Sequence, residues 1–273
     1  MKYSIHKRGE IAMKNILKIM LMMITIYTIA GSAVYAAEIP VSDQDQLITS
    51  RDWTEISNLQ DEMKKEEPDA TIDYDKALKV YVDCNLIKLQ TADTKKLTSA
   101  LESANYVWVI PFKMEKTYGM FTVAKGLPLS EEAKSVLTKA EQEEVKNHAG
   151  KWMITETAEH TVEPYYDILL EKREALSDCT RVVLVGSQPG MRQPVALGMD
   201  DETARIWISL GYQYPVMEKI PETQNVESGV YSFDSVAEIS DTYIEDSEVS
   251  TGAGVQSRSS MKYVAGIGII VIG

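Results

Sequence analysis

Apolar and polar positions recur with a regular period between residues 51 and 214, and the first strong patterns predict strands. Residues 75–89 alternate between apolar and polar side chains, which is typical of a strand with one buried face. Residues 105–112 are apolar almost throughout and predict a strand buried on both faces. Residues 117–123 are expected to be its hairpin partner.

Apolar residues at helical spacing lie between these stretches and predict four helices. The first ends at Pro68, because proline cannot continue a helix. Asp93 is placed to cap the second helix, and Ser130 is placed to cap a third that Gly150 closes. The fourth begins at Pro164, since proline is well tolerated in the first helical turn.

The remaining apolar stretches predict a sheet that ends in a meander. Residues 151–156 are an expected strand, and three more follow at 180–186, 193–199 and 203–210. Consecutive strands joined by short turns favour antiparallel pairing. The predicted fold class is therefore α+β: a mostly antiparallel sheet with helices packed on one face, forming a single domain over residues 51–214.

Residues 1–36 have the three parts of a secretory signal peptide. Basic residues come first, an apolar run over 19–30 follows, and small residues lead to Ala36. We place cleavage after Ala36, which sends the remainder across a membrane. An uncleaved anchor is the alternative, but the run is short against the ~20 residues that a spanning helix needs. Residues 37–50, after the cut, are expected to be loosely ordered.

The apolar period stops after residue 214. Residues 215–260 carry many acidic side chains with Ser, Thr and Gly between them, which predicts a disordered, self-repelling stalk. Residues 261–273 then turn apolar, but a helix from 263 onward covers only ~17 Å of a ~30 Å hydrocarbon core. We expect the start of a transmembrane helix truncated at Gly273; a short hydrophobic strand or tail is the alternative.

The charge balance excludes one class of partner. The chain has a formal net charge of −13 and residues 1–36 contribute +4, so the residues after Ala36 carry −17. Such a charge repels nucleic acid and anionic membrane surfaces. We therefore expect no nucleic-acid partner, and the acidic balance mainly favours solubility.

Cys84 and Cys179 are the two cysteines of the chain. Export permits a disulfide between them. Cys84, however, shares an alternating apolar face with its neighbours, where a free thiol behaves as a small hydrophobe. The sequence leaves both possibilities open. Without a Cys-x-x-Cys pair, neither redox catalysis nor a structural zinc site is expected.

Residues 182–199 offer the most tempting catalytic motif, because an apolar strand runs into a Gly-Ser-Gln-Pro-Gly turn. A phosphate loop needs a Lys-Ser/Thr pair that opens a helix, and a nucleophile elbow needs Gly-x-Ser-x-Gly. Here Ser187 directly follows Gly186, and a strand-like run comes next. Gly and Pro are also typical of a hairpin loop. We expect a chain reversal and no catalytic residue.

A metal or cofactor is not expected either. His148 and His160 are the histidines after Ala36, and they lie twelve positions apart instead of four apart on one helical face. Histidines beside solvated carboxylates, such as the glutamates near these two, are usually surface residues.

One surface feature remains, an aromatic group near the end of the predicted domain. Trp207 lies on the opposite strand face from its apolar neighbours, and Tyr212 and Tyr214 follow within reach. An exposed aromatic patch commonly marks a binding surface. The alternative is that helices or the stalk cover these rings.

Together these patterns predict an exported, membrane-tethered, non-enzymatic binding or sensing module of the cell envelope. Its expected place is extracellular or at the cell surface, anchored through the C-terminal segment, and its expected partner is an envelope protein or a small ligand. The alternative is an envelope hydrolase whose site is assembled from non-local residues. A buried cluster of polar groups would favour the hydrolase, and a solvent-facing aromatic patch would favour the binding module.

Overall fold

The structure is a computed structural model that describes residues 39–160, 162–186, 188–191, 193–212, 214–222 and 225–247. The predicted leader of residues 1–36, residues 248–260 of the predicted stalk and the apolar segment 261–273 lie outside the described residues. Within the described part of the chain, no helix combines the length and apolar character that crossing a membrane requires.

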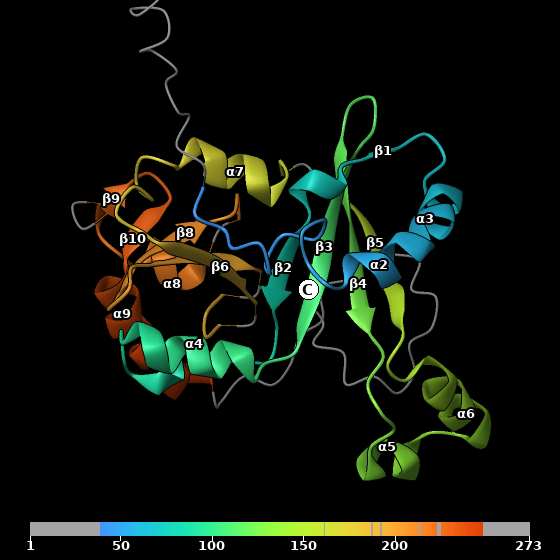
Figure 1. The fold of residues 1–273 in the computed structure, drawn as a ribbon. Helices are drawn as coiled ribbons and strands as arrows, with labels where there is room; N and C mark the ends of the chain where they lie inside the picture. Colours follow the sequence, from blue (N-terminus) through green and yellow to red (C-terminus); the bar gives the residue numbers. More distant parts are fainter. Residues whose placement is uncertain are drawn as a thin grey trace, which may run out of the picture. The chain divides into compact units, whose positions relative to one another are not determined.

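Helices, short 3₁₀ turns and strands follow one another along the described chain (Figure 1). The helices are α2 (Trp53–Ile56), α3 (Gln60–Glu66), α4 (Thr94–Glu102), α5 (Glu131–Val136), α6 (Lys139–His148), α7 (Tyr165–Glu171), α8 (Pro215–Glu218) and α9 (Phe233–Ser247). The 3₁₀ turns are η1 (Ser57–Leu59), η2 (Tyr74–Lys76) and η3 (Ile87–Leu89). The strands are β1 (Thr71–Ile72), β2 (Leu78–Tyr81), β3 (Tyr106–Lys113), β4 (Tyr118–Lys125), β5 (Trp152–His160), β6 (Arg181–Val185), β7 (Val195–Met199), β8 (Ala204–Ser209), β9 (Asn225–Glu227) and β10 (Val230–Ser232).

The strands form one sheet in the order β5-β4-β3-β2-β6-β7-β8-β10-β9, and β1 pairs with β3 beyond the end of β2. All of these pairs are antiparallel except β2 with β6, which is parallel. The prediction of a mostly antiparallel sheet in an α+β domain is confirmed. The parallel pair joins two antiparallel halves.

The helices cover both faces of the sheet, so the prediction that they pack on one face is wrong. Val183 and Val185 of β6 point toward α4, whereas Val182 and Leu184 point toward α7. Side chains alternate between the faces of a strand, so α4 and α7 lie on opposite faces. The sequence pattern of β6, apolar at every position after Arg181, is typical of a strand buried on both sides.

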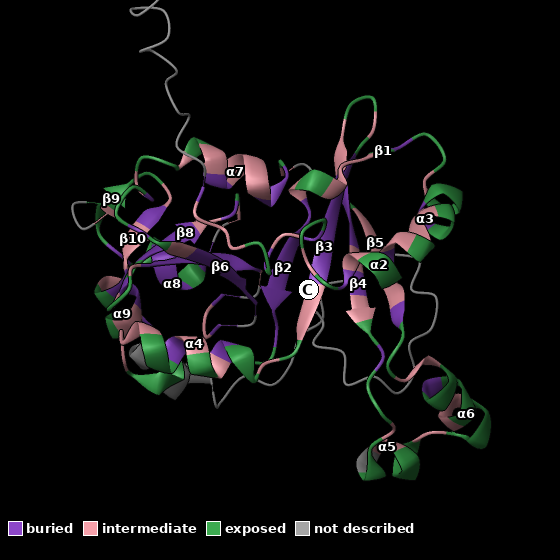
Figure 2. Cartoon of the chain, in the orientation of Figure 1, coloured by how far each residue is buried: buried purple, intermediate pink, exposed green. Residues whose placement is uncertain are grey.

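Three apolar clusters make up the core, and Figure 2 shows the buried positions concentrated along β2, β6 and their neighbours. The α4-side cluster includes Leu97, Leu101, Val183, Leu197, Trp207, Met217, Phe233 and Val236. The α7-side cluster includes Ile39, Val80, Tyr165, Leu169, Val182, Leu184 and Ile208. The α2-side cluster includes Leu47, Ile56, Met63, Trp108, Phe112 and Phe121.

The helix starts follow the predicted caps. The Asp93 side chain accepts hydrogen bonds from the backbone N–H groups of Lys95 and Lys96, and Ser130 caps α5. The helix expected between Ser130 and Gly150 is divided in two, because Thr138 forms a capping box with Glu141 and starts α6. The strand expected over residues 75–89 is shorter in the structure. Only β2 forms there, because the 3₁₀ turns η2 and η3 lie on either side of it.

Residues 39–47 are held in the sheet, which corrects the expectation that residues 37–50 are loosely ordered. Val41 forms a parallel bridge with Val182 of β6, and Gln46 forms an antiparallel bridge with Leu78 of β2. Ile39 and Leu47 are buried in two different clusters. Buried apolar residues spaced along an otherwise polar stretch give no periodic signal, which is why the pattern missed this segment.

The predicted stalk also begins too early. Residues 215–247 contribute α8, the short hairpin of β9 and β10, and α9. β10 pairs with β8, and Phe233 of α9 stacks on Trp207 with ring centroids 5.8 Å apart. The many acidic residues of this segment obscured its apolar pattern in the sequence. A few well-spaced apolar residues nevertheless complete the α4-side cluster.

Candidate functional site

The turn between β6 and β7 is a hairpin, as the sequence predicts. β6 and β7 pair in antiparallel register, from Val185 opposite Val195, and Gly190 has a positive φ of 70°. Gln188 fixes the turn from inside: its side chain accepts from the Leu86 N–H at 2.9 Å and donates to the carbonyl oxygen of Cys84 at 2.6 Å. Ser187 lies outside the described residues.

The aromatic residues expected as a binding patch are mostly core residues, and this corrects the prediction. Trp207 is 0% exposed and Tyr214 is 2% exposed, while Tyr212 is partly buried. α8 and α9, which belong to the segment predicted as stalk, cover Trp207. The alternative weighed for these rings, that they are covered, is the one the structure shows.

Tyr212 instead belongs to a small group of tyrosines. Its hydroxyl lies 3.3 Å from the hydroxyl of Tyr165 on α7. Burial raises the pKa of both phenols, and it also raises the pKa of Glu156 on β5, whose charge acts on both tyrosines. The two phenols therefore stay neutral over a wide range of pH and act chiefly in packing.

The two cysteines are free thiols. Cys84 packs at the margin of the α4-side cluster, and Cys179 lies in the α7-side cluster. Of the two possibilities that the sequence leaves open, the structure shows the free thiols, because these clusters occupy opposite faces of the sheet. Burial raises the pKa of each thiol to about 11.

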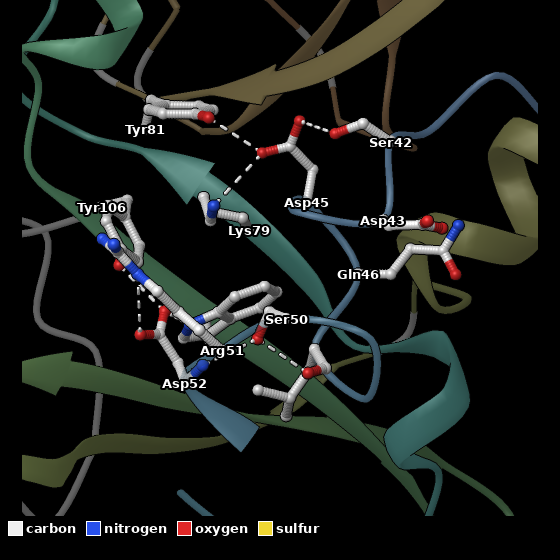
Figure 3. Close-up of polar contacts among 12 residues, drawn as sticks. Ser42, Asp43, Asp45, Gln46, Ser50, Arg51, Asp52, Lys79, Tyr81 and Tyr106 are labelled. Carbon is white, nitrogen blue, oxygen red and sulfur yellow. Dashed lines mark hydrogen bonds and ion pairs between the residues drawn. The ribbon is translucent and has the colours of Figure 1, made fainter. Parts of the chain in front are cut away.

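The strongest concentration of buried charge lies on β2, where the sequence predicted no site (Figure 3). We call it the Asp45–Lys79–Asp52 cluster. Asp45, Lys79 and Asp52 are 2%, 9% and 8% exposed, although such side chains are almost never buried unless they are paired. Lys79 projects from β2, Asp45 comes from the N-terminal segment that pairs with the edges of β2 and β6, and Asp52 immediately precedes α2.

Asp45 is the centre of this cluster. The hydroxyl groups of Ser42 and Tyr81 donate to its carboxylate at 2.7 and 2.8 Å. Arg181 of β6 donates to the same carboxylate at 3.1 Å, and the Lys79 ammonium lies 3.4 Å away. Asp45 thus binds donors from both β2 and β6, the two strands at which the halves of the sheet meet.

Lys79 lies among aromatic rings. Its ammonium is 4.6 Å from the ring centroid of Tyr106 and 5.3 Å from that of Trp108. A cation close to such rings gains cation–π attraction, which is larger when water is excluded. Figure 3 shows Lys79 between Tyr81, Tyr106 and Asp45.

Asp52 closes the other side of the cluster. Its carboxylate accepts from the Tyr106 hydroxyl at 2.9 Å and from the Trp108 indole N–H at 3.1 Å. The Arg51 guanidinium, which is almost fully exposed, lies 3.9 Å from the carboxylate. Asp52 therefore accepts from two aromatic donors, the partly buried Tyr106 hydroxyl and the buried Trp108 indole.

The electrostatics of the cluster are asymmetric. Burial alone would raise the pKa of Asp45, but the Ser42 hydrogen bond and the charges of Arg181 and Lys79 outweigh burial and lower it. Burial lowers the pKa of Lys79, because the opposing charges of Asp45 and Asp52 offset only part of the desolvation. The carboxylate has many donors and the ammonium has few acceptors, which explains why the two shifts differ in sense.

Chemically, the charged groups of the cluster already interact with groups of the protein: Asp45 pairs with Lys79 and with Arg181 of β6, and Asp52 accepts hydrogen bonds from aromatic side chains. A general base or nucleophile needs a free lone pair within reach of a substrate. Here both oxygens of Asp45 accept donors from the protein, and one oxygen of Asp52 accepts from Tyr106 and Trp108. Lys79 is covered by rings. The arrangement is suited to holding the N-terminal segment against the sheet.

Sequence reasoning missed this cluster because β2 was expected to bury one face only. On that view Lys79 and Tyr81 alternate with apolar residues and face solvent. A signal was nevertheless present in the lysine itself. If β2 is a central strand of a sheet covered on both faces, Lys79 is buried and requires a carboxylate partner.

The described residues can be searched for groups of side chains that could bind a metal ion. His148 ends α6 and is separated along the chain from the acidic residues of β5. Among the described residues, no group of three or more His, Cys, Asp or Glu side chains is arranged to hold a metal ion.

Comparison of the chain with protein-family models, with curated proteins and with solved structures finds no match. Inferences about function therefore come from the chain's own residues.

Proposed function

We propose that the protein is an exported, membrane-tethered, non-enzymatic binding or sensing module of the cell envelope. Residues 1–36 direct export, and the segment from residue 261 fastens the chain to the membrane. The partner is an envelope protein or a small ligand, and the acidic surface disfavours nucleic acid.

One observation carries this proposal: the first described residues, directly after the predicted leader, are already packed in the domain. Cleavage after Ala36 leaves two residues before Ile39, which is 2% exposed and packs in the α7-side cluster. Pro40 follows and accepts a hydrogen bond from the Val182 N–H at 2.7 Å. A leader and a domain with adjacent boundaries are expected when the leader is a removable signal and the mature chain folds by itself.

The Asp45–Lys79–Asp52 cluster supports the non-enzymatic part of the proposal. Convergent buried carboxylates are the feature that would favour an envelope hydrolase. In this cluster, however, each carboxylate accepts at least two hydrogen bonds from the protein. Breaking those bonds to activate a water molecule would leave buried donors unpaired, which costs about 1–3 kcal/mol for each group.

Export is tested by expressing the whole chain in cells that process signal peptides and sequencing the N-terminus of the product. The expected mature sequence begins Ala37-Glu38-Ile39. A chain with Ala36→Leu should keep its leader, because the position before the cut requires a small residue. Recovery of the unchanged chain in the cytosol with residues 1–36 attached would overturn the proposal.

The tether is tested in the same cells by fractionation. The full chain should be recovered with membranes, and a matched chain that stops at residue 260 should be released as a water-soluble protein. Equal release of both chains would show that the C-terminal segment does not anchor the domain.

A further inference from the structure

Residues 39–47 occupy a gap between β2 and β6. The two strands pair directly only at Val80 with Leu184 and at Tyr81 with Val185. Before this point, the free edge of β6 pairs with Val41 and the free edge of β2 pairs with Gln46. The other edges are already used, since β6 also pairs with β7 and β2 also pairs with β3. The segment therefore fills a space between diverging strands.

The walls of this gap offer the features of a peptide-binding site. Main-chain groups hold the segment on both sides. The backbone N–H of Val182 donates to the carbonyl oxygen of Pro40 at 2.7 Å, and the backbone N–H of Lys79 donates to the carbonyl oxygen of Asp45 at 3.0 Å. The segment runs parallel to β6 at Val41 and antiparallel to β2 at Gln46, and a turn over residues 43–45 lies between the two bridges. A peptide held at strand edges gains affinity from main-chain bonds and specificity from side-chain pockets. Ile39 and Leu47 fill apolar pockets, one in the α7-side cluster and one in the α2-side cluster.

The specificity element is the receptor for the Asp45 carboxylate. Tyr81 and Lys79 come from one wall of the gap, and Arg181 comes from the other. All three belong to β2 and β6 and none belongs to the segment. The receptor thus belongs to the folded body, and the carboxylate belongs to the segment.

We propose that the gap between β2 and β6 is a binding site for a peptide that turns between the two strand edges, and that its second occupant, besides the chain's own residues 39–47, is the same segment of another copy. The other copy is the partner whose side chains fit both pockets and the carboxylate receptor. Exchange of a terminal element between identical chains requires no new surface. The proposal rests on the proposed function in one respect, since cleavage after Ala36 gives the segment a free end.

Peptide binding to the full mature chain, residues 37–273 in detergent, tests this proposal. The probe is a fluorescent synthetic peptide of residues 37–50, and the readout is its anisotropy. The matched control peptide carries Asp45→Asn, which keeps the shape but removes the charge. The wild-type peptide should bind and be displaced by unlabelled peptide, and the control peptide should bind at least tenfold more weakly.

A chain with Asp45→Ala sharpens the test, because its own segment is held less tightly while the receptor is intact. This variant should bind the wild-type peptide at least tenfold more tightly than the unchanged chain does. If the variant fails to fold, the unchanged chain at high peptide concentration still decides the matter. Absence of binding to every folded chain, or equal binding of both peptides, overturns the proposal. The assay uses no cells, so its result is independent of whether export occurs.

Discussion

At the scale of single residues, Asp45 shows how one carboxylate can organise a boundary between two parts of a sheet. It accepts from Ser42 in its own segment, from Tyr81 on β2 and from Arg181 on β6. Removing one partner of a buried charge pair is strongly destabilising, because the remaining charges stay buried without compensation. Much of the stability of the junction therefore depends on the charge at this position.

The pH dependence of stability follows from the lowered pKa of Asp45. A group whose pKa is lower in the folded state contributes stability above its unfolded pKa, near 3.8, and loses that contribution as the pH falls through the folded pKa. Asp45→Asn should lower the free energy of unfolding by about 3 kcal/mol at pH 7. The difference between the variant and the wild type should shrink below pH 4.

Denaturant unfolding at pH 7 and at pH 3 measures both effects. Asp43→Asn is the matched control, because Asp43 is exposed and two positions away, and it should change stability by less than about 0.5 kcal/mol. A difference between Asp45→Asn and wild type that stays constant from pH 7 to pH 3 would contradict the role given to the charge.

At the scale of elements, the sequence predicts best where local chemistry decides. The Asp93 cap, the β3–β4 hairpin and the β6–β7 turn are all local features, and all three are confirmed. The parallel pairing of β2 with β6 joins residues about a hundred positions apart, and no local pattern encodes such a partner. The burial of Lys79 follows from that pairing and was missed with it.

The β6–β7 turn gives a prediction at this scale. Gln188 is 3% exposed and links the turn to the loop after β2 through Leu86 and Cys84. Gln188→Ala should reduce the free energy of unfolding by about 1–3 kcal/mol, because the buried Leu86 N–H is left without its acceptor. Gln142→Ala, which removes hydrogen bonds at the surface of α6, is the control and should have a smaller effect. Thermal or urea unfolding compares them, and equal losses would contradict the turn's buried linkage.

At the scale of the whole molecule, the sequence indicates the class of fold but not how its faces are covered. An apolar run such as 182–185 predicts a strand buried on both sides, yet it does not say which helices supply the cover. α9 was missed because acidic side chains recur along it, although Phe233 and Val236 are spaced for one buried helical face. The assignment of residues 39–47 failed for a related reason, since their partners lie on strands far along the chain.

The position of the cysteines tests the arrangement of the faces. Cys84 packs with the α4-side cluster and Cys179 with the α7-side cluster, so the sheet itself separates the two sulfur atoms. The purified protein, kept without reductant, should show two free thiols in denaturant with a thiol-specific dye. Both should react slowly in the native state at pH 8, because burial raises each thiol pKa to about 11 and limits access. If both thiols react with the dye in denaturant but react slowly in the native protein, then neither face of the sheet opens readily. Recovery of a Cys84–Cys179 disulfide, detected as a mass loss of about two hydrogen atoms, would mean that the faces are not separated as described.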